Sequence, residues 1–216
     1  MNRVLDKKSS NKDVFINCPF DAGFLDIFRA IIFAVRACGF RPRCAKDEND
    51  GAQVRIEKIY KLIEDCDWGI HDLSAVALDK NSGLPRFNMP LELGISLGAK
   101  RYGGARQKTK CILILDKESH SYDASTSDIS GQDNETHGGD PHEAIKVVRN
   151  WLSSTSDANG QTLPGGQALV NDFKKVRAEI NKLIKAHQLD PWPKMTHPDY
   201  LRCLDAALNK ISTTSA

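Results

Sequence analysis

The sequence lacks the features that mark membrane, nucleic-acid-binding and secreted proteins. Its longest apolar run, Ala30 to Val35, is far too short to cross a bilayer, and the polar start of the chain has no apolar region of the kind that a secretory signal needs. The 30 basic and 28 acidic side chains nearly cancel, so the net charge of +2 would not draw the protein to nucleic acid or anionic lipid. We therefore expect a cytoplasmic protein with no nucleic-acid partner and no membrane association.

Metal and cofactor signatures are also missing. The six cysteines form no CxxC pair and show no regular spacing, which is typical of reduced intracellular thiols. No Walker loop, GxGxxG fingerprint, HExxH motif or nucleophile elbow is present. We expect no disulfide framework, no metal and no bound cofactor. The cysteines are Cys18, Cys38, Cys44, Cys66, Cys111 and Cys203.

What the sequence does contain is an alternation of short apolar runs and helical periodicity. The 216 residues suffice for one substantial core with an appendage. Alternating strands and helices with right-handed crossovers give a parallel sheet covered by helices. We therefore predict an α/β fold with an open parallel sheet of about four to five strands. The predicted strands are 14–17, 40–45, 68–72 and 111–115, and the helices between them are 24–35, 54–63 and 90–99.

The C-terminal part of the chain has a different pattern. Residues 116–140 are rich in Ser, Asp, Gly and Asn, which is typical of a mobile loop or of a lid carrying Tyr122, Asp128 and Gln132. Beyond it, apolar residues at helical spacing and a capping box at Thr196 and Asp199 predict three helices. We expect a disordered tail over 1–12, an α/β domain over 13–140, and a helical extension over 141–216 packed on the same core.

Polar residues gather where the predicted strands end. In open parallel sheets ligands bind beyond the carboxyl ends of the strands, so these residues are candidates for a binding site. Glu92, expected in the first turn of the third helix, would face Asp72 across the same cleft. Simpler interpretations are a helix-dipole contact for Glu92 and a turn cap for Asp72. The residues at the strand ends are Asn17 and Asp21, then Asp47, Asp50 and Arg55, then Asp72.

Three segments carry a resemblance to a known superfamily. The stretch from Asn88 to Gly98, NMPLELGISLG, resembles the helix that bears the catalytic glutamate of nucleoside 2-deoxyribosyltransferase-like proteins. Residues 63–74 resemble the third strand of those proteins, which ends in aspartate, and 14–17 are similar to the first strand of TIR-like domains. The resemblance covers roughly residues 12–116. It implies a flavodoxin-like fold, and many TIR-like domains cleave the nicotinamide–ribose bond of NAD.

The resemblance also implies roles for individual residues. Glu92 would be the catalytic carboxylate, Asp72 a second catalytic residue that contacts or orients the ribose, and the loop from Asn17 to Asp21 part of the nucleotide site. Asn17-Cys18-Pro19-Phe20 departs from the Ser-rich start usual in TIR-like domains, and the helical extension belongs to neither pattern. The expected substrate contacts are Asn17, Cys18, Phe20, Asp21, Asp50, Arg55, Asn88 and Met89.

These observations lead to one main hypothesis and two alternatives. The main hypothesis is an enzyme that cleaves an N-glycosidic bond of NAD or another nucleotide, as a glycohydrolase or ribosyltransferase, because a fixed carboxylate stabilises the cation-like ribosyl transition state. A homo-oligomer and a role in antiviral defence accompany the resemblance. The first alternative is a non-catalytic nucleotide-sensing module that self-assembles. The second, a receiver-like domain with Asp72 as phosphoacceptor, is disfavoured because Asn17-Cys18 replaces the required acidic pair.

Overall fold

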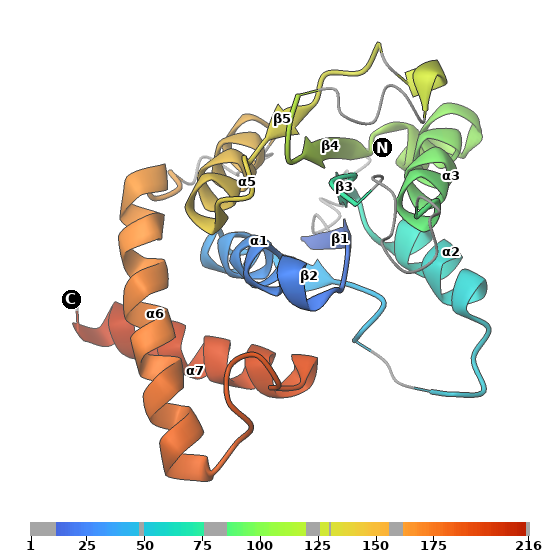
Figure 1. Cartoon of the computed structure of the whole chain (residues 1–216). Coiled ribbons are helices and arrows are strands. Elements are labelled where there is room, and N and C mark those ends of the chain that lie inside the picture. The colour runs from blue at the N-terminus through green and yellow to red at the C-terminus, as the bar shows by residue number, and fades with distance from the viewer. Residues whose placement is uncertain are drawn as a thin grey trace, which may run out of the picture.

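The computed structural model describes residues 12–47, 50–75, 86–119, 126–129, 131–155 and 162–214. Its centre is a five-stranded parallel sheet with the order β2-β1-β3-β4-β5 (Figure 1). This is the strand order of flavodoxin-like proteins, so the predicted fold class is confirmed. Except for Lys12, the expected tail over 1–12 lies outside the described residues. The strands are β1 (Asp13–Asn17), β2 (Arg41–Arg43), β3 (Trp68–Asp72), β4 (Cys111–Asp116) and β5 (Glu135–Thr136).

The direction of the crossovers distributes the helices over the two faces of the sheet. The chain moves outward from β1 to β2 and then back across β1 to β3, and right-handed crossovers in opposite directions place their helices on opposite faces. Accordingly α1 and α5 lie together on one face, and α2 and α3 on the other (Figure 1). The helices are α1 (Leu25–Ala37), α2 (Arg55–Asp65), α3 (Asn88–Tyr102), α4 (Ala105–Lys108), α5 (Pro141–Thr155), α6 (Gly166–His187) and α7 (His197–Thr214), with short 3-10 turns at Ala22–Phe24 and Ser127–Ile129.

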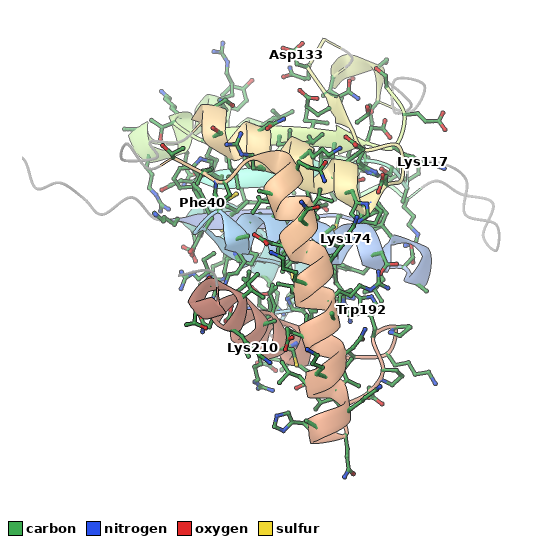
Figure 2. The ribbon with its side chains drawn as sticks, turned by 90° about the vertical axis from the view of Figure 1, so that its left-hand side faces the viewer. Phe40, Lys117, Asp133, Lys174, Trp192 and Lys210 are labelled. Carbon is green, nitrogen blue, oxygen red and sulfur yellow. The ribbon has the colours of Figure 1, made fainter. Side chains whose placement is uncertain are left out.

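The main core joins the sheet to the C-terminal helices. All five residues of β1 and of β3 are buried, as expected for strands covered on both faces. Residues 27–35 of α1 are buried on every side, because the sheet lies against one side of the helix and α5, α6 and the 192–200 region against the others. Figure 2 shows α6 lying across α5 and α1, with Trp192 beside it. The helical extension therefore shares one core with the sheet.

A buried arginine ties the last part of the chain to α1. The guanidinium of Arg29 donates hydrogen bonds to the carbonyl oxygens of Trp192 and Met195. It also lies 4.6 Å from the Trp192 ring centroid and 4.9 Å from that of Tyr200, whose hydroxyl donates to the Arg29 carbonyl. Of the predicted capping box, the N-cap contact is present next to this arginine: the Thr196 hydroxyl oxygen accepts the backbone N–H of Asp199 at 3.3 Å, and the hydroxyl donates to the Asp199 carboxylate at 2.8 Å.

Several details differ from the sequence-based expectations. Glu92 is the fifth residue of α3, so it lies beyond the first turn and the helix dipole does not account for it. β5 adds a fifth strand inside the polar 116–140 segment, where two residues carry no detectable pattern. In α2, Val54 at the N-cap and Tyr60 are exposed and not part of the apolar face. Among the described residues, no helix has both the length and the apolarity that crossing a membrane requires.

Candidate functional site

A pocket opens at the carboxyl end of β1, between the loop that follows this strand and the start of α3. Its cavity volume is about 80 Å³, and it opens to solvent. The strand order reverses beside β1, which is where open parallel sheets bind their ligands. The pocket is lined by Phe15, Ile16, Asn17, Cys18, Pro19, Phe20, Ala45, Arg55, Arg86, Asn88, Met89 and Glu92.

Glu92 is the carboxylate of this pocket. It is 6% exposed, and among the described residues no hydrogen bond or ion pair holds its side chain. Burial raises the pKa of Glu92 from the ordinary 4.5 to about 7, although the charge of Arg55 opposes the change. A buried carboxylate without partners destabilises a fold, because its desolvation is not compensated. Such a group is typical of a functional site, where the perturbed pKa is used.

Asn17 holds the start of α3 against the sheet. Its side-chain amide donates to the carbonyl oxygen of Met89 at 3.0 Å and to Nδ1 of His71, also at 3.0 Å. Burial, assisted by Lys110, lowers the pKa of His71 to about 3, so this ring is neutral and accepts at Nδ1. Both amide hydrogens of Asn17 are therefore used within the fold. Asn17 positions the helix that carries Glu92, three residues beyond Met89.

The mouth of the pocket is basic and aromatic. Arg55, the first residue of α2, is exposed and has no ion pair among the residues that the structure describes. Arg86 pairs with Asp21 at 2.6 Å, and both side chains are more than a third exposed. The ammonium of Lys46 lies 4.5 Å from the centroid of the Phe20 ring. This mouth suits a ligand that combines anionic groups with a flat ring.

Asp72 lies in a separate buried cluster and does not line the pocket. It is fully buried; one carboxylate oxygen accepts the Ser74 N–H at 2.9 Å, and the other lies 3.1 Å from Nε2 of His137. Nδ1 of His137 accepts the Gly139 N–H, which places the ring proton on Nε2, facing Asp72. The expected meeting of Asp72 and Glu92 is therefore not what the structure shows. The Asp72 carboxylate instead fixes the turn after β3 and the segment after β5.

Seven of the ten expected site residues line the same pocket. Asp21 reaches only its rim, through Arg86. Asp50 is exposed and accepts the N–H of Ala52 at 3.0 Å, as a turn former does. The seven are Asn17, Cys18, Phe20, Arg55, Asn88, Met89 and Glu92.

Sequence reasoning missed three residues of this region. Arg86 lies two positions before the expected contact Asn88, and this proximity was the signal that could have identified it. His71 lies within the predicted strand 68–72 and carries no local signal that it is the partner of Asn17. His137 lies in the polar 116–140 segment, and only the parallel pairing of β5 with β4 brings it to Asp72.

The described part of the 116–140 segment does not cover the pocket. Asp128 and Gln132 instead line an open groove beside the second half of α3, with Leu97 and Tyr102. Ile129 packs against the buried cluster that contains Leu73, Met89, Leu93 and Ile114. Tyr122 lies outside the described residues. None of the described residues of this segment lines the pocket, so they give no support to its role as a lid.

Comparison with protein-family models, with curated proteins and with solved structures gave no match to this chain.

Proposed function

We propose that this protein cleaves an N-glycosidic bond of NAD or a related nucleotide, with Glu92 as the catalytic carboxylate. The observation that carries the proposal is the state of Glu92, which is buried, without partners among the described residues, and located in a pocket at the ligand-binding edge of the sheet. The resemblance of residues 88–98 to the helix with the catalytic glutamate in deoxyribosyltransferase-like proteins supports the same role.

In the proposed reaction the ionised Glu92 carboxylate stabilises or attacks C1′ of the ribose as the bond from C1′ to the base nitrogen breaks. The bonding electrons leave with the base. Water or another acceptor then bonds to C1′, displacing the Glu92 oxygen where that has bonded to C1′, and loses a proton to the Glu92 carboxylate or to solvent. Only the ionised form of Glu92 supports the cation-like transition state. With a pKa of about 7, roughly half of the free enzyme holds this form at neutral pH.

The pocket chemistry favours a pyridinium leaving group over a purine. Among the described lining residues, Glu92 is the only carboxylate, so no separate general acid stands by to protonate the departing base. Nicotinamide leaves NAD as a neutral molecule and needs no proton, whereas adenine or guanine leaves a nucleoside as an anion unless it is protonated. We therefore rank NAD and NADP above purine nucleosides as substrates.

The basic mouth suits the phosphates of such a substrate. Arg55 and Arg86 border the pocket that contains Glu92, and the guanidinium group is well matched to phosphate oxygens. The Asp21 carboxylate, which Arg86 engages, would compete with a phosphate for that guanidinium. Arg55 carries no such competitor among the described residues, so it is the stronger candidate for a phosphate contact.

The test is chromatography after incubation with NAD, NADP, NADH, and a panel of nucleosides and nucleoside monophosphates. The expected result is release of nicotinamide from NAD and NADP by the wild type. In Glu92→Gln, which keeps the shape of the side chain and removes its charge, the rate of release should fall by about 10²-fold or more. Glu57→Gln, an exposed glutamate of α2, is the matched control and should remain active. Equal release by Glu92→Gln and wild type would remove Glu92 from the mechanism.

A second candidate function is nucleotide sensing without turnover. The single carboxylate in the described lining favours it, because a site that only binds does not need the second catalytic group that many glycosidases use. Calorimetry separates the two functions. Binding of NAD with complete recovery of the intact ligand, and unchanged affinity in Glu92→Gln, would support sensing.

A further inference from the structure

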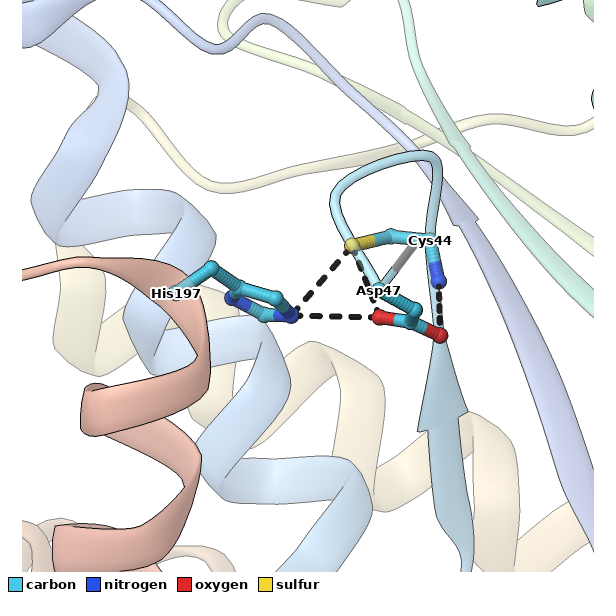
Figure 3. A group of neighbouring side chains, drawn as sticks. All are labelled: Cys44, Asp47 and His197. Atoms are coloured by element: carbon cyan, nitrogen blue, oxygen red, sulfur yellow. Dashed lines mark hydrogen bonds and ion pairs between the residues drawn. The ribbon is translucent and has the colours of Figure 1, made fainter. Parts of the chain in front are cut away.

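A second group of reactive side chains lies outside the pocket, where the loop after β2 meets the start of α7. Figure 3 shows the side chains of Cys44 and Asp47, from this loop, and of His197, the first residue of α7, pointing toward one another. Sγ of Cys44 lies 3.3 Å from Oδ1 of Asp47 and 3.4 Å from Nε2 of His197, and Nε2 lies 3.2 Å from Oδ1. Three potential metal ligands of different chemical type therefore converge on one point.

Hydrogen bonds alone do not satisfy this arrangement. If the imidazole proton is on Nε2 it is donated to Asp47, and because the Cys44 thiol also donates to Asp47, no proton then lies between Nε2 and the Cys44 sulfur. Nδ1 is buried without a partner among the described residues in every case, so it does not distinguish the arrangements. If the proton is on Nδ1, the lone pair of Nε2 faces a carboxylate oxygen at 3.2 Å, which is repulsive. In either case at least one of the three close contacts lacks an attractive proton. A cation at the centre of the triangle would make all three contacts favourable.

The geometry also excludes a catalytic relay. In a Cys-His-Asp relay the acid contacts one ring nitrogen and the thiol the other, so that the imidazole passes a proton between them. Here Cys44 and Asp47 both face the same nitrogen, Nε2. Moreover, the Cys44 residue is 1% exposed, so a substrate would not reach its sulfur.

We propose that Cys44, Asp47 and His197 bind a zinc ion, with Sγ, Oδ1 and Nε2 at three corners of a tetrahedron. Typical zinc–ligand bond lengths and tetrahedral angles place such atoms about 3.3–3.6 Å apart, close to the three separations observed. A thiolate, an imidazole and a carboxylate are all established zinc ligands. Water would complete the tetrahedron, since no fourth protein ligand is present among the described residues.

The surroundings of the cluster suit this role. The second oxygen of the Asp47 carboxylate accepts hydrogen bonds from the Cys44 N–H at 3.0 Å and from Nε of Arg43 at 3.1 Å, which turns Oδ1 toward the other two ligands. Such outer contacts orient metal ligands and increase their affinity. Zinc binding would release one proton, from the Cys44 thiol, and the thiolate and carboxylate would then balance the charge of the ion.

The three ligands come from two segments far apart in sequence, but they meet where the start of α7 contacts the loop after β2. His197 is 150 residues from Asp47. The ion would therefore link α7 to a distant loop, and Ala45 of that loop lines the Glu92 pocket. This long separation explains why the cysteine spacing indicates no metal site. The inference does not depend on the proposed glycosidic cleavage, because none of the three ligands lines the Glu92 pocket.

The test uses the tag-free protein of 216 residues. Elemental analysis is expected to find one zinc per chain, and replacement by Co²⁺ should produce a thiolate-to-cobalt charge-transfer band with the intense visible bands of a tetrahedral site. Cys44→Ser and His197→Gln should lose the charge-transfer band or the metal. Cys203→Ser, a cysteine on α7 outside the cluster, is the control and should retain both. Arg43→Gln should weaken binding by about 10–100-fold through Asp47.

Two results would overturn the proposal. One is a protein that holds no zinc and shows no charge-transfer band with Co²⁺. The other is a band that persists unchanged in Cys44→Ser. If the variants do not fold, thermal melting of the wild type decides: a strong chelator is expected to lower the melting temperature, and zinc to restore it. A melting temperature that neither chelator nor zinc changes would mean that the cluster is a metal-free contact.

Discussion

Replacing Glu92 by glutamine is expected to stabilise the folded protein at alkaline pH. Burial raises the pKa of Glu92 from 4.5 to about 7, so the folded state resists ionisation of this group more than the unfolded chain does. Below pH 4.5 the carboxyl is protonated in both states and costs nothing. As the pH rises through the window from 4.5 to 7, the unfolded chain ionises first and stability is lost.

The magnitude follows from the difference between the two pKa values. At about 1.36 kcal/mol per pKa unit, full ionisation costs the wild type about 3 kcal/mol of folding free energy. Most of this loss falls between pH 5 and pH 8, over which the wild type should lose about 2–3 kcal/mol relative to Glu92→Gln. Glutamine cannot ionise, so the variant avoids the loss while it retains nearly the same volume.

The assay is urea denaturation of both proteins at pH 5 and pH 8. The free energy of unfolding of Glu92→Gln minus that of the wild type should increase by the stated amount at the higher pH. Glu57→Gln, which replaces an exposed glutamate, controls for general effects of charge and should show little change. An increase below about 1 kcal/mol for Glu92→Gln would refute the reasoning, because the carboxylate would then be solvated or paired in the folded protein.

Four further outcomes are expected. The rate of nicotinamide release, as kcat/KM, should rise with pH through a pKa near 7 as Glu92 ionises, and a flat profile would contradict this. Arg55→Gln should move that profile to higher pH and raise KM for NAD, because the Arg55 charge lowers the Glu92 pKa. Asn17→Ala should lower the free energy of unfolding in urea by roughly 1–3 kcal/mol and lower activity, because it removes the hydrogen bond to the start of α3. Arg29→Met should cost roughly 2–4 kcal/mol in the same assay by leaving the carbonyl groups near Trp192 unpaired.

The fold was predictable because its signals are local. The apolar spacing in α1 and α6 and the continuous apolar run of β4 each follow from residues a few positions apart. Short elements without a pattern were not predictable. β5 has two exposed residues, and its place in the sheet comes only from pairing with the end of β4.

The candidate site was predictable in part. The rule that ligands bind at the carboxyl edge of a parallel sheet brought Asn17, Cys18 and Glu92 together correctly. The same rule placed Asp72 there too, but side chains at the edge of a sheet can point toward either face. The hydrogen bonds to Ser74 and His137 hold the Asp72 carboxylate away from the pocket that contains Glu92. Strand ends identify an edge, whereas the direction of a side chain depends on its partners.

By itself the sequence determined the order of the longer strands and helices, the parallel sheet, and the stretch of chain around Glu92, because periodicity and strand ends depend on neighbouring residues. The tertiary structure decided which of these residues meet. In the folded protein Glu92 is buried without a partner among the described residues, the Asp72 carboxylate contacts His137, and His197 contacts Cys44. Contacts between residues so far apart arise from how helices pack on the sheet, and that packing is a property of the whole core.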